Sequence, residues 1–98
     1  MDNHSLAASG PGSVVLDLGP GVGALVLHAT PAEVGQEIDI SPVGGGVRTH
    51  SAVRERRLRD GSVYCAVYPS VPAGDYTVWL TPTVVVSVVA GTVTELHR

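Results

Sequence analysis

Hydrophobic and polar residues alternate along several short stretches of the chain, a period-two pattern typical of β-strands. The pattern is clearest in residues 36–42, where Ile38 and Ile40 share one side and Glu37, Asp39 and Ser41 share the other. We expect a strand there, with its isoleucines in a core and its polar side in solvent. No stretch carries apolar residues at helical spacing over three turns, so we expect no long helix.

Glycine and proline separate the β-prone segments throughout the chain and mark its turns. About seven short strands are expected among the β-prone segments, which are 13–18, 24–30, 36–42, 47–58, 63–68, 74–81, 84–89 and 92–97. Strands of this length and spacing predict an all-β fold, an antiparallel β-sandwich. Residues 1–12 are expected to be a flexible tail and residues 13–98 a single domain.

Asp60-Gly61 is the strongest hairpin signal, because both residue types tolerate the positive φ angles of a type I′ turn. With this turn, Arg54 is expected to lie opposite Val67 in the neighbouring strand. Both faces of the strand at 63–68 are then largely apolar, so we expect the strand either to be covered on both sides or to present one side as an interface.

Two further turns are expected nearer the ends of the chain. Residues 13–18 and 24–30 flank a glycine-rich turn at 19–23. Ala90-Gly91 is expected to be the turn of a closing hairpin formed by residues 84–89 and 92–97.

The strand expected at 74–81 places a tryptophan on its outward side. Tyr76, Val78 and Leu80 alternate inward there, whereas Thr77 and Trp79 point outward. Tryptophan is over-represented at interface hot spots, and an exposed apolar patch marks an interaction surface. We therefore expect a face that binds a protein partner or a second copy of the chain, formed by Trp79, Val63, Cys65, Val67 and Thr77.

Basic residues are concentrated in one segment of an otherwise acidic chain. Residues 48–60 hold five of the six arginines, whereas residues 1–47 hold five acidic residues and no arginine. An anion or nucleic-acid phosphates could bind to Arg48, Arg54, Arg56 and Arg57. The net charge of −3 and the four aromatic residues argue against nucleic acid. The alternative hypothesis is that Glu37 and Asp39 pair with Arg48 or its neighbours on an exposed strand face.

The histidines and the single cysteine give little indication of chemistry. His28, His50 and His97 lack the close spacing of a metal site, so we expect no metal and no cofactor, and keep these three only as candidate ligands for an alternative hypothesis. Cys65 has no cysteine partner for a disulfide, and among apolar neighbours its thiol is expected to be inert. No G-x-S-x-G nucleophile elbow is present, so catalysis is not expected.

No signal peptide and no apolar run of bilayer length is evident, so the cytoplasm is the expected compartment, without a membrane partner.

Residues 71–78, Val-Pro-Ala-Gly-Asp-Tyr-Thr-Val, resemble the L-P-x-G-x-Y-x-V corner of prealbumin-like sandwiches, which include carboxypeptidase regulatory-like and collagen-adhesin B-type domains. Residues 86–94 resemble the final hairpin of those domains, V-x-V-x-x-G-x-x-T. The resemblance implies a prealbumin-like or Ig-like sandwich in the C-terminal third of the chain. In it, Pro72 and Gly74 shape a tight turn and the Tyr76 ring inserts between the sheets, with its hydroxyl bonded to backbone.

The resemblance does not extend to the activity found in the transthyretin-like branch of that fold. That hydrolase of a purine-degradation intermediate has a C-terminal Y-R-G-S, whereas this chain ends Glu-Leu-His-Arg. The front half, over residues 17–41 and 48–57, resembles short actinobacterial proteins of no assigned function.

These observations favour a small non-enzymatic β-sandwich that binds a protein partner or associates with itself. Two alternatives remain open. One is a transthyretin-like small-molecule hydrolase or a histidine-based metal-binding domain, and the other is an arginine-mediated binder of anions or nucleic acid.

Overall fold

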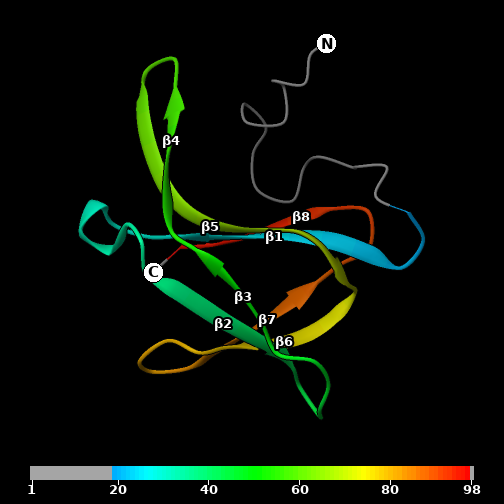
Figure 1. Ribbon diagram of the computed structural model, residues 1–98. Helices are drawn as coiled ribbons and strands as arrows, with labels where there is room; N and C mark the ends of the chain where they lie inside the picture. The colour runs from blue at the N-terminus through cyan, green and yellow to red at the C-terminus, as the bar shows by residue number, and fades with distance from the viewer. Residues whose placement is uncertain (1–18, 98) are drawn as a thin grey trace.

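Two four-stranded sheets pack face to face in the computed structural model of the chain, which describes residues 19–97 (Figure 1). The first sheet has the strand order β4-β5-β1-β8, with β4 (Arg54–Leu58), β5 (Gly61–Pro72), β1 (Val22–His28) and β8 (Val93–Leu96). The second has the order β3-β2-β6-β7, with β3 (Thr49–Ala52), β2 (Glu37–Pro42), β6 (Gly74–Val78) and β7 (Val84–Val88). Neighbouring strands are antiparallel except β1 and β8, which run parallel. The expected all-β sandwich is confirmed.

The chain fills the two sheets mostly in hairpins. The β2–β3 and β6–β7 hairpins belong to the second sheet, and the β4–β5 hairpin belongs to the first and projects beyond the sandwich (Figure 1). A 3-10 turn, η1 (Pro31–Glu33), lies on the path from β1 to β2. The chain therefore crosses from one sheet to the other between hairpins.

The strand expected at 47–58 is wrong as one element, because Val53 divides it into β3 and β4 in different sheets. Val53 is 1% exposed and packs in the core. Its N–H donates to the carbonyl of Gln36 at 2.8 Å, and its carbonyl accepts from the N–H of Gly35 at 2.9 Å. One buried valine thus anchors the corner where the chain changes sheets.

The closing hairpin expected at 84–97 is also wrong. After β7 the chain crosses to the first sheet, where β8 pairs in parallel with β1. The corner is attached to the start of β1, since Gly91 N–H donates to Val22 O at 2.8 Å and Ala24 N–H donates to Thr92 O at 2.9 Å. The Ala90-Gly91 signal therefore marks a corner between sheets.

The β4–β5 hairpin is confirmed, but its turn and register differ from expectation. Pairing begins at Leu58 and Gly61, so Arg54 lies opposite Cys65 and not Val67. Asp60 does not adopt the positive φ that a type I′ turn requires, whereas Gly61 has φ +144°. The register shift is two residues, so each side chain stays on its expected face.

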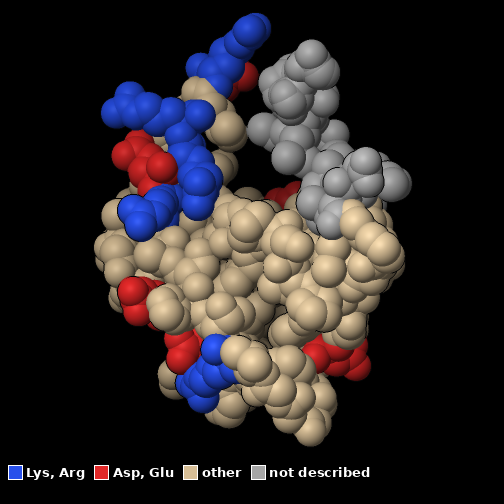
Figure 2. Space-filling view, turned by 45° about the vertical axis from the view of Figure 1, so that its right-hand side comes forward, with Lys and Arg blue, Asp and Glu red and all other residues tan. Residues whose placement is uncertain are grey.

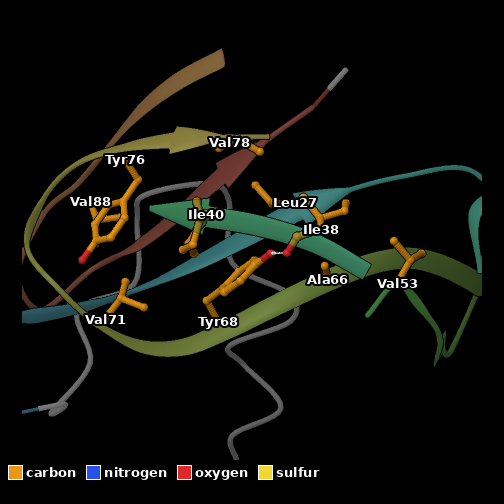
Figure 3. Packing of buried hydrophobic residues seen from close by; sticks show 11 residues of the cluster. Leu27, Ile38, Ile40, Val53, Ala66, Tyr68, Val71, Tyr76, Val78 and Val88 are labelled. Atoms are coloured by element: carbon orange, nitrogen blue, oxygen red, sulfur yellow. Dashed lines mark hydrogen bonds between the residues drawn. The ribbon is translucent and has the colours of Figure 1, made fainter. Parts of the chain in front are cut away.

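The core lies between the two sheets and contains two buried tyrosines (Figure 3). As expected, Ile38 and Ile40 of β2 face this core. The Tyr68 hydroxyl donates to the carbonyl of Ile38 and so ties β5 to β2 across the sandwich (Figure 3). The Tyr76 hydroxyl donates to the carbonyl of Pro72, four residues earlier, at the corner between β5 and β6. Gly74, at φ +144°, supplies the turn of this corner.

Burial in the core raises the pKa of both tyrosines. The pKa of Tyr68 rises to about 12, mainly because its phenolate would lose water and secondarily because of the negative charge on Asp39. Burial raises the pKa of Tyr76 for the same reason.

The tail expected at 1–12 and the strand expected at 13–18 lie outside the described residues. Both edges of β1 are filled, by β5 and by β8, so β1 offers no edge to a further strand. Between residues 19 and 97, no helix has the length and hydrophobicity needed to cross a membrane.

Candidate functional site

Trp79 lies at the end of β6 on the outer face of the second sheet, as its alternation with Val78 indicates. Its backbone N–H donates to Asp39 O at 2.9 Å, and its indole Nε1–H donates to Ser41 Oγ at 2.9 Å. The Arg48 guanidinium lies over the ring, with its Cζ 4.4 Å from the ring centroid. Arg48 Nε also donates to Asp39 Oδ2 at 2.8 Å, which confirms the pairing expected across the glycine loop.

We call this surface the Trp79 face and define it by Trp79, Thr77, Ser41, Asp39 and Arg48. The tryptophan stays 44% exposed although its edge, its backbone and one side of its ring are held by neighbours. A ring fixed in this way loses little conformational freedom on binding, which favours tight contact with a partner. The Trp79 face is therefore suited to protein recognition.

The interaction face expected from the sequence is divided between the two sheets. Thr77 and Trp79 lie on the outer face of the second sheet, whereas Val63, Cys65 and Val67 belong to β5 in the first sheet. These three point away from the core, because Ala66 and Tyr68 alternate with them inward. Cys65 is only 3% exposed. The expectation of one continuous face is wrong, because β5 and β6 are joined by a corner that crosses the sandwich.

β7 borders the Trp79 face and is an edge strand of the second sheet. Val85 lies opposite Thr77 on the outer side and is 62% exposed. On the side away from β6, β7 makes no backbone hydrogen bond to the described residues, and Ser87 O accepts only a long 3.3 Å bond from Thr94 Oγ1. We call this side of Val84–Val88 the β7 edge.

A groove of about 650 Å³ opens beside the start of β7, between the two sheets. Its walls are largely apolar and include Leu80, Pro82, Val84 and Leu96, with His97 also in its lining. The groove is thus lined by the first residue of β7 and the last residue of β8.

The four arginines expected to bind an anion do not form one site. Arg48 belongs to the Trp79 face, and the other three lie on β4 in the other sheet. Arg54 and Arg56 point to one side of β4 and Arg57 to the other. Figure 2 shows basic side chains gathered over the projecting hairpin, with acidic side chains among them. The basic segment is thus spread over two sheets and both faces of one strand.

The structure brings two of the three scattered histidines together. The rings of His28 and His97 stack with centroids 4.0 Å apart and planes 6° apart. Glu95 joins them, with its Oε1 2.6 Å from His28 Nε2. His50 lies on the second sheet, where its Nε2 is 4.0 Å from Glu37 Oε1. Glu95 was missed in the sequence because no local pattern links it to a histidine 67 residues away.

Comparison of the chain with models of known protein families, with curated proteins and with solved structures gives no match.

Proposed function

We propose that this protein is a non-enzymatic interaction module that associates with a second copy of itself through the β7 edge. The observation that carries the proposal is the composition of that edge. β7 reads Val-Val-Val-Ser-Val, with neither a charge nor a proline. An open strand edge of this kind presents unpaired N–H and C=O groups to another strand.

The other three edge strands each carry features that discourage such pairing. β4 holds four charged residues in five, and β8 is four residues long and contains Glu95. β3 is equally short, begins directly after Arg48 and contains His50. Charged side chains and short length are the common protections of a sheet edge. Among the four edge strands of the described sheets, β7 alone lacks an Asp, Glu, Lys or Arg within or immediately beside it.

A second copy is the partner that fits this edge best. Two β7 strands related by a two-fold axis run antiparallel, so each offers the other the same set of donors and acceptors. Neither strand brings a charge that would repel its copy. Pairing would join the two second sheets into one continuous sheet of eight strands.

The surfaces beside β7 add apolar contact to this pairing. On the outer side, Val85, Thr77 and Trp79 form a band that leads from the edge to the Trp79 face. On the inner side, an added strand would lay its valines over the groove lined by Leu80, Val84 and Leu96. Burial of apolar area on both sides contributes to the stability of the pair.

The corner closed by the Tyr76–Pro72 hydrogen bond supports a kinship with prealbumin-like sandwiches, which we also propose.

Val85→Lys is expected to weaken self-association by about 100-fold or more, which corresponds to about 2.8 kcal/mol. Each copy would then place a lysine on its β7 strand, and the two like charges would lie close together where the two β7 strands pair. Sedimentation equilibrium from micromolar to submillimolar concentration should show a reversible dimer for the wild type and a monomer for the variant. Trp79→Ala should cause a smaller loss, on the order of tenfold.

Val47→Lys is the matched control, because Val47 is also exposed but lies in the β2–β3 loop, toward the opposite edge of the same sheet. This variant should dimerise like the wild type, and circular dichroism should confirm the fold of all variants. A wild type that stays monomeric throughout, or equal dimerisation of the two lysine variants, would overturn the proposal.

A further inference from the structure

The C-terminal ends of β1 and β8 lie side by side, because these two strands run parallel. Leu27 and Leu96 form the last pair of the ladder, and both pack on the core. The next residues, His28 and His97, therefore share the outer face, together with Glu95 two positions before His97. This arrangement depends on the parallel register and brings three metal-ligating side chains to one place.

The three side chains are close enough to hold one metal ion. Glu95 Oε1 lies 2.6 Å from His28 Nε2 and 4.0 Å from His97 Nε2, and one ligand atom from each residue lies within 4.8 Å of the others. Bonds of about 2.0–2.1 Å to a tetrahedral ion place its ligand atoms about 3.3 Å apart. Small side-chain rotations would reach that spacing.

The three residues differ in burial in a way that suits a metal site. The side chains of His28 and Glu95 are 21% and 19% exposed and are held in the sheet, whereas His97 is 62% exposed and can turn toward an ion. The stacked rings put both imidazoles beside a single carboxylate, which can bridge toward either of them. Two ligands are thus positioned in advance and one is adjustable.

We propose that His28, Glu95 and His97 form a binding site for a divalent transition metal, with Zn²⁺ as the best-fitting ion. Two imidazole nitrogens and one carboxylate oxygen suit zinc and its neighbours, whereas magnesium and calcium prefer sites made only of oxygen. Three protein ligands leave at least one coordination position for water. The site is separate from the Trp79 face, which lies on the other sheet.

Isothermal titration with zinc chloride tests the site directly. The wild type should bind one Zn²⁺ per chain, whereas magnesium chloride should give no binding. Glu95→Gln and His28→Asn should each weaken zinc binding by at least about tenfold. His50→Asn is the matched control, because His50 also lies near a glutamate but on the second sheet. That variant should bind zinc like the wild type.

Nuclear magnetic resonance of the wild type gives a readout that needs no variant to fold. Zinc should shift the imidazole signals of His28 and His97 and leave those of His50 unchanged. Val85→Lys should bind zinc with wild-type affinity, so a failure of self-association leaves this test intact. The proposal is overturned if the wild type binds no zinc, if Glu95→Gln or His28→Asn binds as tightly as the wild type, or if His50 alone responds.

Discussion

Gly23→Ala is expected to destabilise the protein by about 3 kcal/mol or more. A Cβ atom at this position would lie 2.5 Å from Val89 O, 2.9 Å from Val88 Cγ1 and 3.1 Å from Thr92 O. Two of these are backbone atoms of the corner between β7 and β8, so no side-chain rotation removes the overlap. The corner would have to move away from β1, where Gly91 and Thr92 hold it by hydrogen bonds.

Gly44→Ala is the control that separates close packing from backbone conformation. Gly44 has φ +92°, and nothing lies within 4 Å of the position its Cβ would take. Its replacement should cost only the strain of the left-handed region, about 1 kcal/mol. Urea unfolding measures both variants. A loss for Gly23→Ala no larger than that for Gly44→Ala would contradict the packing described for this corner.

Tyr68→Ala is expected to cost about 3–5 kcal/mol, because it empties a large site at the centre of the core. Tyr68 is 3% exposed, and its ring and hydroxyl both contribute to the contact between sheets. Tyr68→Phe keeps the ring and removes only the donor to Ile38 O, so it should cost about 1–3 kcal/mol. Thermal and urea unfolding of the two variants separate the packing from the hydrogen bond.

Tyr68 also makes the free energy of unfolding depend on pH in the alkaline range. The phenol has a pKa of about 12 in the folded protein and 10.0 as its ordinary value, so the unfolded chain loses this proton at lower pH than the folded chain. Unfolding therefore releases a proton between these two pH values, and the free energy of unfolding should fall as pH rises through that window. Below pH 10 the stabilisation that the raised pKa of Tyr68 represents is fully present.

Because Tyr76 shifts in the same direction, the informative quantity is the difference between wild type and Tyr68→Phe. The wild type should lose more stability than the variant between pH 10 and 12. Parallel loss in both proteins would contradict the burial of the Tyr68 hydroxyl.

Local patterns in the sequence are enough to predict much of each sheet. The alternation in β2 assigns Ile38 and Ile40 to the core, and that in β6 assigns Trp79 to the surface, because both strands are buried on one side only. The pairing of Asp39 with Arg48 follows from two strands joined by a short glycine loop. Each of these features depends on residues near one another in the chain.

Features that depend on how the strands assemble could not be predicted in the same way. In the sequence, Val53 looks like an apolar residue within one polar strand. Only the structure shows that it is buried between the sheets and that the chain changes sheets at this residue. Edge and centre positions likewise follow from the topology, so the sequence of β7 does not show by itself that only one of its sides pairs with another described strand. The grouping of His28 with Glu95 depends on a parallel register between strands at opposite ends of the described chain.

Amide hydrogen exchange of β7, measured at low and at high protein concentration, tests self-association through this strand most directly. The amides of Val84–Val88 that point away from β6 should exchange more slowly at high concentration, because a second strand would then bind them. The amides of β4, at an edge protected by charge, should exchange equally at both concentrations. Unchanged exchange across β7 would contradict the proposed dimer.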